Sequence, residues 1–278
     1  MTYQTIEVRK LTPSVGAEIF GVDLGGELGN RQVEDIRTAF LENQVIFFRD
    51  QTMSTERFKA FGRHFGKLYI HPEPRFPVPG HPELLGIKAD ETSKSVAGEV
   101  WHSDVSCDPE PPLGSILHMH EIPANGGGDT VFASMYHAYD ALSDSMKRYL
   151  AGLTAVHEGD RVYKARRPEN QKPGKTYLQA EHPVVRTHPE TGRKALFVNR
   201  YFTSHIAQLK ADESAGLLDM LYQHLESPMY QCRFKWQVGS VAFWDNRCLQ
   251  HYAVWDYFPQ RRFGHRLTIC GDKPYYRA

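Results

Sequence analysis

The sequence predicts a mainly β fold with flanking helices (α+β), organised as a jelly-roll core in a single domain over residues 1–278. Three observations support this prediction. From about residue 98 onward, short apolar runs alternate with turn-forming residues, which is typical of an antiparallel sandwich or barrel. A few other segments have helical spacing. A chain of 278 residues is also long enough to enclose one large core.

The segments before residue 98 predict short strands and two amphipathic helices. Strands are expected within 5–25 ("TIEVRKLTPSVGAEIFGVDLG") and 44–51 ("QVIFFRDQ"), and helices over 30–43 ("NRQVEDIRTAFLEN") and 54–66 ("STERFKAFGRHFG"). Asn30 and Ser54 have side chains that commonly accept a hydrogen bond at a helix N-terminus. We therefore expect each to be the N-cap of its helix.

The second part of the chain predicts strands with a few helical insertions. Strands are expected at 114–122, 129–134, 182–188, 194–199, 240–246 and 265–272, and helices at 143–153 and 211–228. "GEVWHSDVSC", residues 98–107, also has the composition of a strand. The polar segment 161–181 is interpreted either as a solvated loop or as a lid over a site.

Charge and cysteine usage exclude several classes of protein. The 33 basic residues balance the 33 acidic ones, so nothing favours nucleic acid or an anionic membrane as a partner. The N-terminus lacks the apolar core of a signal peptide and no apolar run is long enough for a membrane helix, which predicts a cytoplasmic protein. The cysteines, Cys107, Cys232, Cys248 and Cys270, have no C-x-x-C spacing, so we expect reduced, mostly buried thiols.

The strand-like segment contains two polar residues, His102 and Asp104, that are two positions apart. Side chains alternate across a strand, so His102 and Asp104 should project from the same face. They could form a surface ion pair, a buried hydrogen-bonded pair, or two ligands of one metal ion. The chain has five His-x-acid pairs where random placement gives roughly two, so the spacing alone decides nothing. In three of the other pairs a proline follows the histidine, which predicts turns, and the fourth lies in a helical stretch; they are His71/Glu73, His81/Glu83, His188/Glu190 and, in the helical stretch, His224/Glu226.

A third candidate ligand follows the turn at residues 245–247. His251 opens the strand after this turn, and two histidines with one carboxylate are the ligand set of non-haem ferrous oxygenases. Such a set leaves positions open for a cosubstrate and dioxygen. A zinc site made of the same residues is the alternative, because the two metals share these ligand types.

Two arginines near the C-terminus favour the oxygenase. Arg262 and Arg266 are four residues apart in a predicted strand, so both should face the interior. Buried arginines need anions, and a guanidinium matches a carboxylate such as the distal one of 2-oxoglutarate. The alternative is that these arginines pair with structural acids such as Asp256 or Asp272. Arg261 should alternate outward.

Together, several segments resemble the taurine dioxygenase (TauD/TfdA) family of iron(II)- and 2-oxoglutarate-dependent oxygenases. The similarity spans nearly the whole chain and follows the family order: "GAEIFGVDL", "QVIFFRDQ", "WHSDVS", "GGGDTVFAS", "HPVVRTHPETGRKALFVN", "WDNRCLQHYAVWDYFPQRR" and "GDKPYYRA". The resemblance implies a double-stranded β-helix, a variant of the jelly roll. It also implies homo-oligomers, since the family commonly forms dimers or tetramers.

The resemblance further implies specific roles for residues of this chain. His102, Asp104 and His251 would bind Fe(II), and Arg262 with Thr130 would bind 2-oxoglutarate. In the family's taurine enzymes a histidine and an arginine hold the sulfonate, and His71 and Arg266 match these positions. The pocket-wall positions are matched by Val105, Tyr163 and Phe202.

The polar partners of the taurine amine are not matched in this chain. Where the taurine enzymes have Tyr, Asn and Ser, the matching positions hold Pro74, Gly98 and Val162. Burying an ammonium group without partners is expensive. The resemblance and these departures therefore imply a sulfonate, sulfate ester or carboxylate with a less polar tail, hydroxylated with O2 while 2-oxoglutarate is converted to succinate and CO2. Hydroxylation next to a heteroatom would release the anion and an aldehyde. Taurine dioxygenase proper, or a zinc hydrolase with the same ligands, are the alternatives.

Overall fold

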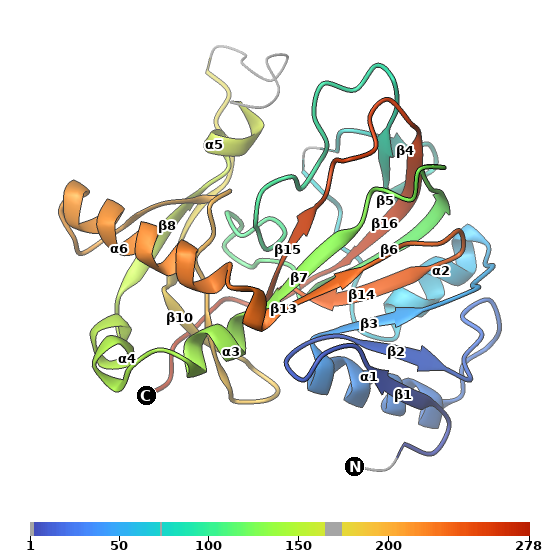
Figure 1. Cartoon of the computed structure of the whole chain (residues 1–278), viewed down its shortest axis with the longest axis horizontal. Helices are drawn as coiled ribbons and strands as arrows, with labels where there is room; N and C mark the ends of the chain where they lie inside the picture. The colour runs from blue at the N-terminus through green and yellow to red at the C-terminus, as the bar shows by residue number, and fades with distance from the viewer. Residues whose placement is uncertain (1–2, 73, 165–173) are drawn as a thin grey trace.

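An eight-stranded sheet forms the centre of the computed structural model, which describes residues 3–72, 74–164 and 174–278 (Figure 1). The strand order is β1-β2-β3-β14-β6-β16-β5-β4, and neighbouring strands are antiparallel except β2 and β3. The strands are β1 (Glu7–Lys10), β2 (Ala17–Phe20), β3 (Val45–Phe48), β14 (Val241–Asp245), β6 (Gly114–Glu121), β16 (Arg262–Ile269), β5 (His81–Ala89) and β4 (Pro77–Val78). Within the described residues this sheet is open, with β1 and β4 at its edges.

A second sheet packs on one face of the main sheet. It has the order β13 (Gln231–Phe234), β7 (Thr130–Ser134), β15 (Leu249–Ala253). Phe47 of β3 stacks on Phe234 with ring centroids 3.9 Å apart, and meets Phe132 of β7 edge-on at 5.5 Å. These rings belong to one buried apolar cluster that includes residues of both sheets. The two sheets therefore enclose a common core.

Two helices cover the opposite face of the main sheet (Figure 1). They are α1 (Asn30–Asn43) and α2 (Thr55–Arg63). Side chains alternate along β14, so Ala242 and Trp244 face the second sheet while Phe243 faces the helices. Phe243 stacks on Phe40 of α1 with centroids 4.0 Å apart. The main sheet is thus buried on both faces at β14.

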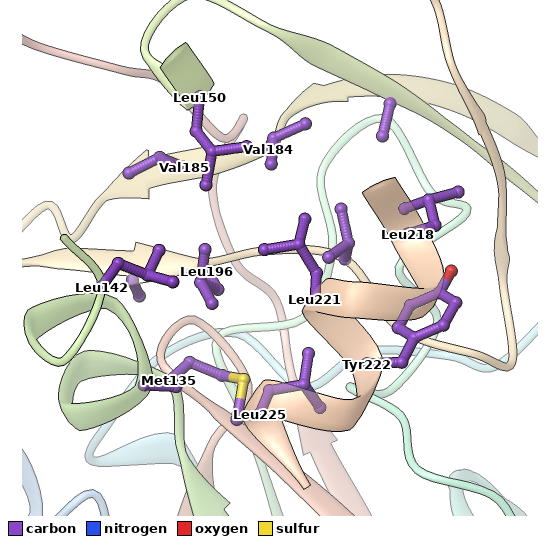
Figure 2. Packing of buried hydrophobic residues seen from close by; sticks show 14 of the residues in the cluster. Met135, Leu142, Leu150, Val184, Val185, Leu196, Leu218, Leu221, Tyr222 and Leu225 are labelled. Atoms are coloured by element: carbon purple, nitrogen blue, oxygen red, sulfur yellow. The ribbon is translucent and has the colours of Figure 1, made fainter. Parts of the chain in front are cut away.

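A third group of elements has its own apolar cluster. It contains the three-stranded sheet β12 (Thr203–Ile206), β8 (Thr154–Glu158), β9 (Gln179–Pro183), and the pair β10 (Val185–Thr187) and β11 (Lys194–Leu196). Its helices are α3 (Met135–Asp140), α4 (Asp144–Leu150), α6 (Ala211–Leu225) and η2 (Pro228–Tyr230). The short helix α5 (Asp160–Tyr163) follows β8, and its buried residues belong to a separate small cluster. Figure 2 shows Leu221 of α6 pointing toward Leu196 of β11, and Leu225 of α6 near Met135 of α3 in the same cluster.

The prediction of a mainly β chain with flanking helices is confirmed. Ser54 is the N-cap of α2, and its hydroxyl accepts a hydrogen bond from the backbone N–H of Arg57 at 3.3 Å. The cap predicted for α1 is wrong by one residue, because Gly29 occupies the cap position and Asn30 begins the helix. In the part of the chain that the structure describes, every helix is too short or too polar to cross a bilayer.

Two other predictions from local sequence are wrong. His81 precedes a proline and was expected in a turn, whereas it is the first residue of β5, next to the sheet edge. Residues 98–107 were expected to form a strand, whereas His102 makes one isolated bridge and the chain turns immediately after it. This second difference lies at the candidate site.

Candidate active site

Three buried side chains converge on one point. The potential ligand atoms of His102, Asp104 and His251 all lie within 4.8 Å of one another. His251 lies in the middle of β15, and its backbone bridges to that of His102: His102 N–H donates to His251 O at 3.2 Å, and His251 N–H donates to His102 O at 2.9 Å. The two imidazole centroids are 4.1 Å apart. The structure therefore brings together all three residues that the sequence suggested as metal ligands.

The convergence does not come from the alternation of a strand. After the bridge at His102 the chain turns through residues 104–107, and Asp108 N–H donates to Val105 O at 2.9 Å. Val105 has φ = 47°, a value that β-branched residues rarely adopt. Such backbone strain is found mainly where surrounding contacts impose it, often at functional sites. The position of Asp104 is thus set by a turn that tertiary contacts hold in place.

Residues from two other strands hold Asp104 in this turn. Ser115 of β6 donates its hydroxyl to Asp104 Oδ2 at 2.7 Å. Asn246, just after β14, accepts the backbone N–H of Asp104 at 3.2 Å and donates to Ser115 Oγ at 3.3 Å. Trp244 Nε1 donates to the same Asn246 oxygen at 3.1 Å. This buried network fixes both the backbone and one carboxylate oxygen of Asp104.

Both imidazoles are in the neutral form that metal binding requires. Burial lowers the pKa of His102, and it lowers the pKa of His251 well below the ordinary value. His102 Nδ1 lies 2.8 Å from Val100 O, so we place the proton on Nδ1, which leaves Nε2 as the lone-pair donor. Among the described residues, the buried Nδ1 of His251 has no hydrogen-bond partner.

The Asp104 carboxylate is ionised and carries an ion pair. Burial alone would raise its pKa, but the charge of the nearby Arg266 and the hydrogen bond from Ser115 act against that effect, and the pKa lies well below the ordinary value. Arg266 Nη1 donates to Asp104 Oδ1 at 2.7 Å. Arg266, the predicted anion-binding residue, therefore contacts a candidate metal ligand directly. Its buried Nε has no hydrogen-bond partner among the described residues.

Arg262 is a buried cation with no carboxylate partner in the described part of the chain. Its Nε donates to Gly128 O at 3.2 Å, and its guanidinium lies over the Trp236 ring at 5.6 Å from the centroid. Burial lowers its pKa. Thr130, at the start of β7, accepts the Trp236 Nε1–H at 2.9 Å. Arg262 and Thr130 line the same cavity, so both can contact a bound anion.

The structural acids that could have explained Arg262 have other partners. Asp272 accepts a hydrogen bond from Arg186 at 3.0 Å, and Asp256 lies 3.7 Å from Arg233. Arg261 points outward, as predicted, and pairs with Glu121 at 2.7 Å on the surface. The alternative in which Arg262 pairs with Asp256 or Asp272 is therefore wrong.

A cavity of about 110 Å³ contains the three candidate ligands and both arginines. The structure places His71, Val105, Tyr163 and Phe202 on its wall. Val105, Tyr163 and Phe202 are buried in one small apolar cluster, while His71 is half-buried with its ring perpendicular to that of Tyr163 at 6.1 Å. All ten predicted site residues therefore line a single cavity.

Gly98 and Val162 also line this cavity, whereas Pro74 is exposed. Gly98 has φ = +86°, and a Cβ added to it would lie 3.0 Å from His102 Cε1. A side chain at position 98 would therefore require the His102 ring to shift. Val162 belongs to α5, and residues 165–173 of the polar segment after it lie outside the described residues. The loop and lid interpretations of that segment both stay predictions.

A second group of possible ligand atoms has a different explanation. His188, Asp245 and Cys248 are buried and mutually close. However, Arg247 donates to both Asp245 oxygens, at 2.8 Å from Nε and 2.7 Å from Nη2, and His188 Nε2 donates to Oδ2 at 3.0 Å. These donors already satisfy the carboxylate. We interpret the group as a buried network that anchors the turn between β14 and β15, next to Asn246.

The residues at the first cluster fit a divalent transition metal. Two neutral imidazoles and one carboxylate are ligands that both Fe(II) and Zn(II) accept, and three protein ligands leave further positions open. His102 has the second hydrogen bond, through Nδ1, that commonly orients a metal-binding histidine.

Sequence reasoning missed Ser115, Asn246 and Trp236, which contact Asp104 or Thr130. A serine within a strand and an asparagine in a turn have ordinary local explanations, so their spacing carries no signal. Cys107 is buried, and burial raises the pKa of its thiol to about 12, in agreement with the expectation that it packs.

Comparisons with known proteins were then made for the whole chain. Residues 7–268 match the family model described as "Taurine catabolism dioxygenase TauD, TfdA family". An alkylsulfatase of Acinetobacter baylyi is 36% identical, with 97% of this chain and 86% of that protein covered. An alpha-ketoglutarate-dependent sulfate ester dioxygenase of Pseudomonas putida is 34% identical, with coverages of 97% and 91%. The crystal structure of a taurine dioxygenase from Burkholderia xenovorans has a TM-score of 0.84 and 37% identity, with coverages of 98% and 93%.

Proposed function

This chain belongs to the TauD, TfdA family, so it is a 2-oxoglutarate-dependent dioxygenase, and we propose that it uses Fe(II) to hydroxylate a small organic anion. The observation that carries the proposal is the buried cluster of His102, Asp104 and His251 in a cavity that is also lined by Arg262, which has no carboxylate partner among the described residues. A zinc hydrolase would need the three ligands but would give no role to the cationic group beside them.

In this proposal His102, Asp104 and His251 hold the metal, and Thr130 and Arg262 hold the distal carboxylate of 2-oxoglutarate. When bound, Fe(II) and 2-oxoglutarate would supply the oxidising chemistry with O2, and succinate and CO2 would be formed. The protein contributes position. Arg262 is buried and held by Gly128 O, so its Nη atoms can form the paired hydrogen bonds that a carboxylate accepts. Trp236 orients the Thr130 hydroxyl.

The substrate head group is proposed to bind between His71 and Arg266, with Val105, Tyr163 and Phe202 around it. Arg266 supports this role because its buried Nε has no hydrogen-bond partner in the described part of the chain, while Nη1 contacts Asp104. An anion held there lies beside the metal ligands, which fixes the C–H bond that is oxidised. If that carbon bears the sulfate or sulfonate group, its hydroxylation leads to an aldehyde and the released anion.

The proposed substrates are sulfonates, sulfate esters or carboxylates with a tail less polar than that of taurine. Gly98 and Val162 support this choice, because they give an ammonium group no hydrogen-bond acceptor on their part of the wall. Taurine dioxygenase is the second candidate, favoured by the 37% identity to a solved taurine dioxygenase. The similarity to sulfate ester enzymes favours the first.

The fold type, the domain organisation, the cellular location and the oligomeric state belong to the same proposal. We propose that the two packed sheets are the two halves of a jelly roll, or double-stranded β-helix, and that residues 1–278 form one domain. The free cysteines support a cytoplasmic location. Assembly into a dimer or tetramer stays a prediction.

The metal and cosubstrate are tested by anaerobic addition of Fe(II) and 2-oxoglutarate to the apoprotein. A weak visible charge-transfer band is expected, and it should be lost in Asp104→Ala but kept in Asp108→Ala, whose carboxylate is not part of the ligand cluster. A zinc enzyme would stay colourless and would turn over substrate without 2-oxoglutarate. That outcome would overturn the assignment.

The substrate class is tested by measuring succinate release with a panel of anions. Alkyl sulfates, alkylsulfonates and aryloxy acids are compared with taurine at equal concentration. We expect higher kcat/KM for at least one anion with an apolar tail. If taurine exceeds every other compound, the inference drawn from Pro74, Gly98 and Val162 is wrong, although the dioxygenase assignment stands.

A further inference from the structure

A second cavity adjoins the candidate active site. It has a volume of about 70 Å³ and shares six lining residues with the first cavity: His71, Ile87, Ala97, Ala253, Arg262 and Arg266. Two of these shared residues, Ala97 and Ala253, have small side chains and lie beside Gly98. A Cβ built on Gly98 would already be 3.6 Å from the Ala253 Cβ. The least side-chain material therefore separates the two cavities at Ala97, Gly98 and Ala253.

The second cavity is mainly apolar beyond this boundary. Phe76, Leu85, Val96 and Tyr257 contribute its large hydrophobic side chains. Its two further cations have partners: Lys88 Nζ lies 2.7 Å from Asp90 Oδ2, and Arg75 donates to Ser95 O at 3.3 Å. The Arg75 guanidinium also lies over the Phe76 ring, 5.3 Å from its centroid. Neither charge therefore requires an anion from a ligand.

We propose that this second cavity, the tail cavity, binds the aliphatic tail of the substrate. The proposal rests on the proposed function, because it takes the anionic head group to lie at His71 and Arg266. Both residues line both cavities, so a head group held there lies at the junction. The reacting carbon then faces the metal ligands, and the rest of the chain passes Ala97, Gly98 and Ala253 into the apolar space.

The volume of the tail cavity sets the length of the tail. A water-sized group needs about 10–15 Å³ measured in this way, so 70 Å³ holds at most roughly five methylene-sized groups, because Arg262, which would hold 2-oxoglutarate, lines the same cavity. The favoured substrates are therefore medium-chain alkyl sulfates or alkylsulfonates rather than two-carbon compounds. Burial of each methylene should raise kcat/KM by roughly fourfold until the cavity is full.

The test is a series of linear alkyl sulfates, from ethyl to dodecyl, assayed for succinate and aldehyde with the Fe(II)-loaded enzyme. We expect kcat/KM to rise with chain length and to level off near the hexyl or heptyl ester. Hexyl sulfate with a terminal carboxylate should be a poorer substrate than hexyl sulfate itself. If it is the better one, the cavity binds a second anion through Arg75 and Lys88, and the proposal of an apolar tail site is wrong.

A matched pair of variants locates the effect. Val96→Phe places a larger side chain in the tail cavity, whereas Val8→Phe makes the same change on β1, away from both cavities. Val96→Phe should lower the ratio of kcat/KM for hexyl over ethyl sulfate by about tenfold or more, and Val8→Phe should leave this ratio unchanged. An unchanged ratio in a folded Val96→Phe enzyme would show that the tail lies elsewhere.

The outcomes separate this proposal from the proposed function. If the wild-type enzyme oxidises short and long esters equally well, the tail cavity has no role in recognition but the dioxygenase assignment stands. If no member of the series, and no other organic anion, stimulates 2-oxoglutarate consumption, the proposed function itself fails.

Discussion

Replacement of Ser115 by alanine is expected to weaken metal binding about 10- to 100-fold without unfolding the protein. The Ser115 hydroxyl is fully buried and donates to Asp104 Oδ2 at 2.7 Å. Alanine leaves this carboxylate oxygen without its donor. It also removes the acceptor of the Asn246 amide, which donates to Ser115 Oγ at 3.3 Å. The carboxylate is then less firmly oriented toward the two histidines.

The magnitude follows from the charge on the acceptor. A hydrogen bond to a charged group contributes about 1.5–3 kcal/mol, and about 1.4 kcal/mol corresponds to a tenfold change in a binding constant. Arg266 adds to the effect, because its Nη1 already contacts Asp104 Oδ1 at 2.7 Å and competes with a metal for that oxygen. The loss of the orienting hydroxyl therefore favours the metal-free ion pair.

The assay is anaerobic titration of the apoprotein with Co(II), followed by calorimetry and by the visible spectrum of the bound ion. Thr268→Val is the control, because Thr268 Oγ1 lies 3.4 Å from Ser115 Oγ while Ser115 is the hydroxyl that contacts Asp104. Ser115→Thr keeps a hydroxyl and should recover part of the affinity. If Ser115→Ala binds Co(II) as tightly as the wild type, the inference that Ser115 positions Asp104 is refuted.

Three further predictions concern the cosubstrate, the core and the pH dependence of stability. Arg262→Gln should raise the 2-oxoglutarate concentration that half-saturates the visible band by about tenfold or more, whereas Arg261→Gln, which removes a surface ion pair, should not; equal effects would contradict the assigned role. Phe243→Ala, at a fully buried ring stacked on Phe40, should lower the free energy of unfolding by about 3–5 kcal/mol in urea titrations, against less than about 0.5 kcal/mol for the exposed Phe258→Ala. Burial lowers the pKa of His182 to about 4 and that of His157 to about 3, so below pH 6.5 the unfolded chain binds more protons than the folded one and stability falls as the pH decreases toward 4. Between pH 6.5 and 5 each histidine should lower the free energy of unfolding by about 1–2 kcal/mol, and His182→Gln should flatten this dependence; an identical slope in the variant would exclude His182 as a cause.

The parts of the fold that follow local patterns could be predicted from the sequence. The apolar spacing of residues 30–43 and 54–66 indicated α1 and α2, and the short apolar runs indicated strands such as β6, β14 and β16. These patterns reflect burial of one face of each element, which local spacing records. Elements with weaker periodicity, such as β5 after the His81-Pro82 pair, required the neighbouring strands to be known.

For the candidate site, the sequence could predict which residues take part but not the backbone conformation that brings them together. The spacing of His102 and Asp104 has a chance explanation; local context separated this pair from the other four, and the resemblance to a known family supported its role as a ligand pair. The turn at Val105 could not be predicted, because a valine in "EVWHSDV" favours a strand, whereas the structure gives Val105 a positive φ in a turn whose neighbouring Asp104 is held by Ser115 and Asn246. Local propensity is overridden where long-range hydrogen bonds determine the backbone.

The bridge between His102 and His251 is made by main-chain amides and carbonyls rather than by the imidazole rings. The spacing of the two positions therefore does not depend on which amino acids occupy them. A descendant of this protein could exchange either ring for another donor and still present two side chains at the same separation. A single substitution at either position could therefore change which metal binds, while the backbone conformation stays the same.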